Sequence, residues 1–233
     1  MGCEARVQAS DLLRQSLKRG LARQAMDQAE GDQAQPPLVL AELAGLRPNG
    51  KSVQRVARRL GRLAGVVRVA RLSGHGLMLV LRNRREVTTR SGGAHVFDEP
   101  ALVYTHVAAV LDTVRQRVSL HRAGFGPHAL ERFVERGKVS LDGPLLPQVD
   151  AAAVLLLRAF ARDAVIEEGG DQAISAGSAG LWAGSADLST VEDDWPVAAR
   201  SGGPVPIFSA RTFLSPEVMR PILWLKWSEG ERV

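Results

Sequence analysis

The chain changes from strand to helix within the stretch SLHRAGFGPHALERFVERGK, residues 119–138. Pro127 favours the first turn of a helix, where the missing N–H has no hydrogen-bond partner to lose. At helical spacing, His128, Arg132 and Arg136 project from one face, and apolar residues lie on the other. A strand followed directly by an amphipathic helix indicates a fold that packs helices against a sheet.

The polar face of this predicted helix is a candidate catalytic site made of His128, Arg132 and Arg136. The amino end of a helix favours anions, and an imidazole there could take a proton from a ribose hydroxyl. Two arginines could hold phosphate oxygens as negative charge develops. The alternative is a solvated helix face, since Arg132 and Glu135 have the spacing of a surface ion pair.

The segment HALERFVERG resembles the His-Ala-x-x-Arg-x-x-x-Arg-Gly pattern of RelE-like bacterial toxin-type ribonucleases and their uncharacterised relatives. The resemblance implies a helix packed on an antiparallel sheet, with messenger RNA as substrate. It assigns toxin-like roles to His128, Arg132 and Arg136.

The composition is that of a globular protein: 233 residues, 45% hydrophobic and 24% charged. No apolar run approaches the roughly 20 residues needed to span a bilayer, and the first residues lack the apolar core of a secretory signal. We therefore expect a soluble, cytoplasmic protein. Cys3 is the single cysteine, and the histidines lack ligand-pair spacing, so we expect no disulfide, metal or cofactor in this reading.

Charge is distributed unevenly along the chain. Most of the 30 basic residues are arginines, as in proteins of GC-rich genomes, so the total alone indicates little. Residues 36–90 carry a net charge of +10, whereas residues 146–199 carry −7. The two blocks could face each other within the molecule, or the basic block could form a surface for phosphates.

The remaining pattern predicts an α+β protein: a basic helix-turn-helix and hairpin region, followed by an antiparallel sheet packed with helices. Its parts are residues 1–35 (helix and linker), 36–90 (basic region) and 91–233 (C-terminal α+β domain). Helices are predicted at 11–28, 98–115, 151–167 with Asp150 as cap, and from 215 onward. Strands are predicted at 66–72, 77–82, 118–122, near 173 and 181, and at 205–211. The four tryptophans are expected in the core or cap of the C-terminal sheet.

Residues 38–82 have the order of a winged helix. A first helix at 38–46 precedes a recognition helix at 53–64 capped by Ser52, and the two strands form the wing. The polar residues of the second helix would face nucleic acid: Gln54, Arg55, Arg58, Arg59 and Arg62. Further arginines are available for contacts with the phosphate backbone: Arg68, Arg71, Arg82, Arg84 and Arg85.

The same region contains a competing motif. Residues 45–52, GLRPNGKS, match the phosphate-binding loop of P-loop nucleotidases, with Gly45, Gly50, Lys51 and Ser52 at the defining positions. In that alternative, ATP and Mg²⁺ would be the ligands. The motif requires a preceding strand, whereas residues 38–44 contain a single β-branched residue and favour a helix.

These patterns together predict a nucleic-acid-associated protein that binds the phosphate backbone of DNA or RNA, with RNA-directed chemistry at His128. A P-loop nucleotide-binding protein is the first alternative. A non-catalytic interaction module, with a second copy or another protein as partner, is the second.

Overall fold

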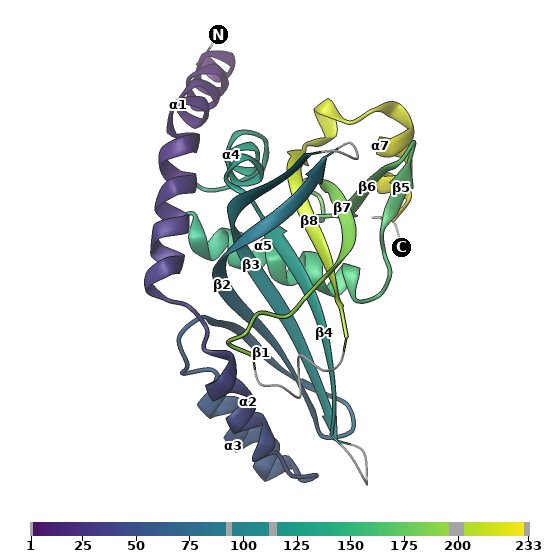
Figure 1. Ribbon diagram of the computed structural model, residues 1–233. Coiled ribbons are helices and arrows are strands. Elements are labelled where there is room, and N and C mark those ends of the chain that lie inside the picture. The colour runs from purple at the N-terminus through teal and green to yellow at the C-terminus, as the bar shows by residue number, and fades with distance from the viewer. Residues whose placement is uncertain (1, 92–94, 112–115, 196–202, 231–233) are drawn as a thin grey trace.

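The computed structural model describes residues 2–91, 95–111, 116–195 and 203–230 (Figure 1). Its centre is an eight-stranded sheet in the order β1-β2-β3-β4-β8-β7-β6-β5, in which β4 and β8 are parallel and the other neighbours antiparallel. The strands are β1 (Val66–Leu72), β2 (Gly76–Ser91), β3 (His95–Leu111), β4 (Gln116–Phe125), β5 (Ile166–Glu168), β6 (Asp171–Ser175), β7 (Leu181–Ser189) and β8 (Val205–Leu214). The α+β class is therefore confirmed.

Helices cover both faces of the sheet (Figure 1). One face carries α1 (Gly2–Gly31), α4 (Pro127–Arg136) and α5 (Leu146–Phe160). The opposite face of β1–β3 carries α2 (Pro36–Ala44) and α3 (Gly50–Leu60). The chain ends with a short 3₁₀ turn, η1 (Pro216–Val218), and α7 (Pro221–Gly230), which packs near β5 and β6.

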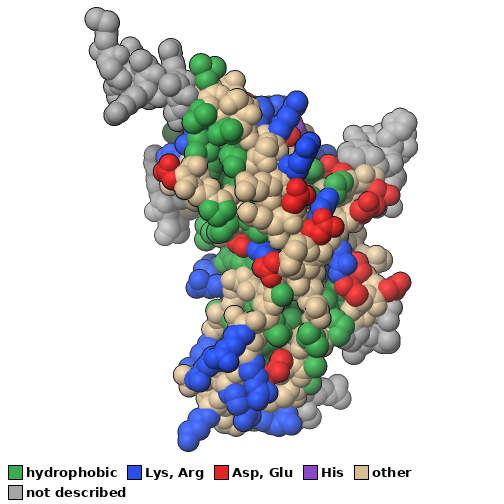
Figure 2. Space-filling view, turned by 90° about the vertical axis from the view of Figure 1, so that its left-hand side faces the viewer, with side chains coloured by type: hydrophobic (Ala, Val, Ile, Leu, Met, Phe, Trp, Pro, Cys, Tyr) green, Lys and Arg blue, Asp and Glu red, His purple; other side chains and the backbone are tan. Residues whose placement is uncertain are grey.

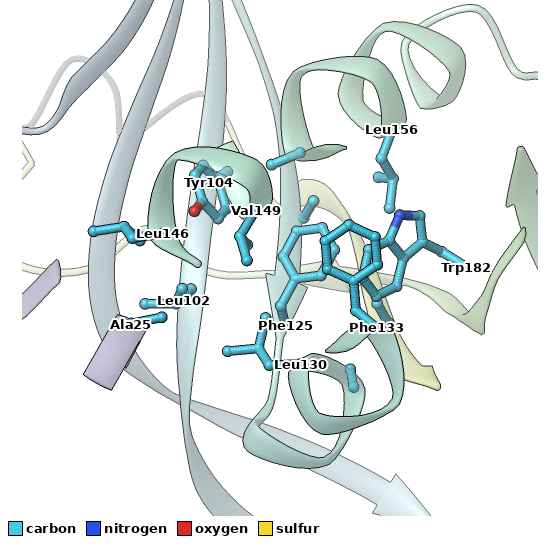
Figure 3. Close-up of a cluster of buried hydrophobic side chains, with 14 of the residues drawn as sticks. Ala25, Leu102, Tyr104, Phe125, Leu130, Phe133, Leu146, Val149, Leu156 and Trp182 are labelled. Carbon is cyan, nitrogen blue, oxygen red and sulfur yellow. The ribbon is translucent and has the colours of Figure 1, made fainter. Parts of the chain in front are cut away.

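The larger core lies between the sheet and α1, α4 and α5 (Figure 3). Trp182 is fully buried there, and its ring meets Phe125 and Phe133 at centroid distances of 4.8 and 4.9 Å. Such close aromatic pairs add about 0.5–1.5 kcal/mol beyond burial of area. Trp182, on β7, confirms the prediction for the C-terminal sheet, whereas Trp195 is buried in the core under α2 and α3, and Trp224 on α7 is 39% exposed.

The helix predicted at residues 98–115 is wrong over residues 98–111, which belong to the strand β3, and residues 112–115 lie outside the described part of the chain. Its side chains alternate between the two faces: Leu102 and Tyr104 enter the larger core, whereas Val107 and Ala109 enter the core under α2 and α3. A strand buried on both faces reads as a nearly continuous apolar run, so spacing alone did not distinguish it from a helix. Pairing with β2 from His95 to Ala109, and with β4 from Leu102 to Leu111, makes this segment a strand.

Asp150 does not cap a helix that starts at residue 151. The helix α5 begins at Leu146, with Pro147 in its first turn, and ends at Phe160. The side chain of Asp150 instead points to the sheet, where it accepts hydrogen bonds from Arg82 and Tyr104. The residues predicted to continue the helix to 167 include the short strand β5.

The strands predicted at residues 66–72, 77–82 and 118–122, near residues 173 and 181, and at 205–211 are confirmed. The first hairpin is much longer than predicted, because β2 continues to Ser91 and pairs with β3. The boundary predicted at residue 90 thus falls within this pairing, and the basic region and the C-terminal region share one sheet.

Candidate nucleic-acid interface

The helix α3 is strongly amphipathic. Its inward face buries Val53, Val56 and Leu60 against the sheet. Burying each of these side chains stabilises the contact by roughly 1.5–3 kcal/mol. The outward face exposes the polar residues predicted for nucleic acid, together with one lysine: Lys51, Gln54, Arg55, Arg58 and Arg59. Arg62, also predicted, is exposed in the turn that follows the end of α3 at Leu60.

Residues 45–52 form the turn between α2 and α3. Asn49, not the predicted Ser52, caps α3, because its side-chain oxygen accepts a hydrogen bond from the Ser52 N–H at 2.8 Å. The buried Ser52 hydroxyl accepts a hydrogen bond from the Arg47 N–H at 3.1 Å. Gly50 and Lys51 occupy the first turn of α3, and Gly45 ends α2.

This arrangement bears on the nucleotide-binding alternative. A P-loop follows a buried strand, and its serine hydroxyl coordinates Mg²⁺. Here the helix α2 precedes the turn, and the Ser52 hydroxyl is already engaged in holding the turn together. Residues 36–60 therefore have the order helix, turn, helix, which differs from the strand, loop, helix order of a P-loop. The helical character predicted for residues 38–44 is confirmed by α2.

Most cations on α3 have no acidic partner within the described part of the chain. Among the residues that the structure describes, Glu42 is the acid that reaches the helix, at 3.5 Å from Arg59. Arg55, Arg58 and Arg62 form no ion pair within the described residues. Figure 2 shows lysine and arginine side chains gathered at the end of the molecule that α2 and α3 form.

Arg71 extends this surface from the sheet. It lies near the end of β1 and is exposed. Its Nη2 atom would lie 3.9 Å from a Cβ built on Gly50, so the guanidinium lies beside the amino end of α3. Arg68 pairs in register with Val80 of the larger core, whereas Arg71 pairs with Leu77 of the core under α3. Arg68 thus projects toward the other face.

Three arginines predicted to be available for phosphate contacts are engaged within the protein. Arg82 is 5% exposed and bonds Asp32 and Asp150, which excludes it from a surface contact. Arg84 pairs with Glu30 and, at 3.7 Å, with Asp27 of α1. Arg85 pairs with Asp194 of the acidic block. The acidic block therefore neutralises part of the basic block, but not α3.

The polar face of α4 has a different environment. Arg132 donates a hydrogen bond to Glu135 at 2.6 Å, and its Nε lies 3.5 Å from His128 Nε2. Lys18 of α1 reaches the same Glu135 carboxylate at 3.1 Å. Arg136 donates a long hydrogen bond, 3.4 Å, to the Phe213 carbonyl. The structure thus brings His128 and Arg132 together but directs Arg136 to the sheet.

A carboxylate lies at the amino end of α4. Gly126 caps this helix, and a Cβ there would lie 2.6 Å from Glu99 Oε1. The protein's own carboxylate therefore occupies the side where the helix would attract an anion. Nothing in the local sequence signalled this contact, because Glu99 lies on β3, in the segment predicted as a helix. The ribonuclease hypothesis for His128 remains a prediction.

Two histidines lie side by side in the sheet. His106 of β3 and His121 of β4 are opposite in register, with ring centroids 6.0 Å apart. Burial lowers the pKa of His106 to about 4, and nearby His121 and Arg158 contribute. Within the described part of the chain, no group of three potential metal ligands comes together.

The chain was compared with protein-family models, curated proteins and solved structures, and none of these comparisons gave a match. Arguments about function therefore depend on the chain's own residues. Among the helices that the structure describes, none combines the length and apolar character needed to cross a membrane.

Proposed function

We propose that this protein binds duplex DNA through α3, with the β1–β2 turn as an adjoining wing. The observation that carries the proposal is the outward face of α3 and the turn that follows it, where Arg55, Arg58 and Arg62 have no acidic partner among the described residues. These cations lie together at one end of the molecule (Figure 2) and provide concentrated, unpaired positive charge for an anionic ligand.

The shape of this surface favours a duplex. Lys51, Arg55 and Arg58 are separated by three or four residues and form one stripe along the helix, about 10 Å long. The major groove of B-DNA is about 12 Å wide and admits an α-helix, whereas that of A-form RNA is too narrow. We therefore infer that α3 enters the DNA major groove and that its arginines contact the flanking phosphates.

The neighbouring elements support the same orientation. In helix-turn-helix proteins the amino-terminal part of the second helix approaches the bases. Here Gln54 is exposed in that part, and Arg71 lies beside its first turn. The β1–β2 turn follows directly and carries exposed His75. A duplex that receives α3 would therefore also meet the turn.

The test is a titration of the protein into a labelled DNA duplex of about 20 base pairs. Fluorescence anisotropy measures the binding constant at several salt concentrations. Each phosphate contact contributes about −0.9 to the slope of log K against log salt. We expect the triple variant with Arg55, Arg58 and Arg62 changed to alanine to reduce the magnitude of that slope by about 3 and to weaken binding at least 100-fold.

A matched control removes three exposed arginines elsewhere: Arg19, Arg23 and Arg162. This variant has the same net charge as the α3 variant, so any general effect of charge appears in both. Equal losses in the two variants would show that α3 is not the site. Binding of single-stranded or duplex RNA at least as tight as that of DNA would overturn the choice of DNA.

A further inference from the structure

The two ends of the α2–α3 unit, the segment that follows α1 and the segment that precedes β1, both bond the main chain of Arg82 on β2. The Arg82 N–H donates to the Gly65 carbonyl at 2.8 Å, just after the unit ends. The Arg82 carbonyl accepts from the Ala34 N–H at 2.9 Å, just before the unit begins. Asn83 adds a hydrogen bond from Nδ2 to the Ala34 carbonyl at 2.8 Å.

The carboxylate of Asp32 joins the same three segments. Its Oδ1 accepts a hydrogen bond from the Gly65 N–H at 3.0 Å, and its Oδ2 accepts one from Arg82 Nη2 at 2.6 Å. The two ends of the unit approach so closely that a Cβ on Gly65 would lie 2.0 Å from the Ala34 nitrogen. Gly65 also has a φ of 66°, which other residues rarely adopt.

The Arg82 side chain is itself held from the opposite direction. Its Nη1 donates to Asp150 of α5 at 2.5 Å, and the Tyr104 hydroxyl donates to the other Asp150 oxygen at 2.7 Å. Burial, together with the adjacent Asp150 charge, raises the pKa of Tyr104 well above its ordinary value. The phenol therefore remains a donor, and Asp32 binds a guanidinium whose position the larger core fixes.

The apolar contacts of α3 with the sheet fix the direction of the helix less well than the hydrogen bonds around Arg82 do. Hydrophobic contact is non-directional, so several tilts of the helix would bury similar areas. Hydrogen bonds to a buried guanidinium have fixed geometry. Direction matters here because Arg55 and Arg58 belong to the α2–α3 unit, whereas Arg71 belongs to the sheet.

We propose that Asp32 and Arg82 are positioning residues that set α3 relative to Arg71, so that both contact the same stretch of DNA backbone. This inference rests on the proposed function. Asp32 and Arg82 touch no nucleic acid; they act through the angle between the helix and the sheet.

The test is a double-mutant cycle between Asp32→Asn and Arg71→Ala, measured as DNA affinity. In the wild-type background we expect Arg71→Ala to weaken binding about fivefold. In the Asp32→Asn background the same change should weaken binding less than twofold, because Arg71 and α3 no longer act together. The variant should fold, because the remaining side-chain oxygen of Asn can still accept from the Gly65 N–H, and Arg82 Nη2 keeps its 3.1 Å hydrogen bond to the carbonyl of residue 32.

Tyr104→Phe is the control, because it removes a hydrogen bond from the same network without touching the ends of the α2–α3 unit. It should lower stability yet leave the fivefold effect of Arg71→Ala unchanged. Additive effects of Asp32→Asn and Arg71→Ala would overturn the positioning role.

Hydrogen exchange separates this inference from the proposed function. In the absence of DNA, Asp32→Asn should speed amide exchange in residues 36–64 and leave α4 and α5 unchanged. Unchanged exchange in residues 36–64 would overturn the inference even if DNA binds. Faster exchange in a protein that binds no DNA would overturn only the proposed function and leave the structural role of Asp32 in place.

Discussion

The helices α3 and α4 look alike in sequence but differ in what surrounds them. Each is short, packs an apolar face on the sheet, and carries arginines on the outward face. On α4, Glu135 accepts hydrogen bonds from Arg132 and Lys18, and Glu99 lies at the amino end. On α3, one acid reaches one arginine. Two helix faces with similar charges can thus differ in how many of those charges neighbouring elements pair, and unpaired charges are the ones available to a ligand.

Charge reversal should reveal the largest difference between the two helices. We expect Arg58→Glu on α3 to weaken DNA binding by about 30-fold or more at 0.1 M salt, because a phosphate contact becomes a repulsion. Arg132→Glu on α4 makes the same change in net charge and should change affinity less than threefold. Fluorescence anisotropy with a single duplex measures both. Equal losses would mean that the two faces do not differ in function.

Removing the shared acid of α4 should have a medium effect, on stability. Glu135 is 18% exposed and binds two cations, so we expect Glu135→Gln to lower the free energy of unfolding by about 1 kcal/mol at pH 7. Glu131→Gln, the same substitution on the same helix without an ion pair in the described structure, should have less effect. Urea denaturation followed by circular dichroism measures the difference.

The effect of Glu135 should depend on pH. Burial alone would raise the pKa of Glu135, but hydrogen bonds from Lys18 and Arg132 lower it below its ordinary value of 4.5. A lowered pKa means that the stabilisation is complete above pH 4.5 and is lost as pH falls through the lower, folded-state value. Wild type and Glu135→Gln should therefore converge in stability at low pH. A difference that persists at pH 2 would contradict this account of the α4 face.

The smallest expected effect concerns the one acid near α3. Glu42→Gln should release Arg59 from its 3.5 Å ion pair and remove a charge that repels phosphates. We expect DNA binding two- to threefold tighter at 0.05 M salt and unchanged at 0.5 M, where exposed charges are screened. Glu86→Gln makes an equal charge change at an exposed position on β2 and serves as control. Weaker binding by Glu42→Gln would argue against a phosphate-facing α3.

Local patterns predicted the elements that contain their own signals. The spacing of Val53, Val56 and Leu60 predicted α3, and Pro127 predicted the start of α4. The turn residues 73–76 predicted the β1–β2 hairpin. Each of these signals depends on residues close together in the chain. The helix predicted in place of β3 failed because a doubly buried strand has no such signal, and only pairing with β2 and β4 distinguishes it.

The sequence by itself determined which residues could form charged faces, since helical spacing places Arg55, Arg58 and Arg62 together, as it does His128 and Arg132. Only the tertiary structure decided which of these charges remain unpaired. Ion pairs such as Lys18–Glu135 and Arg82–Asp150 join residues far apart in the chain. Helix periodicity acts over one or two turns, whereas electrostatic pairing depends on distance in space, which the packing of the sheet sets.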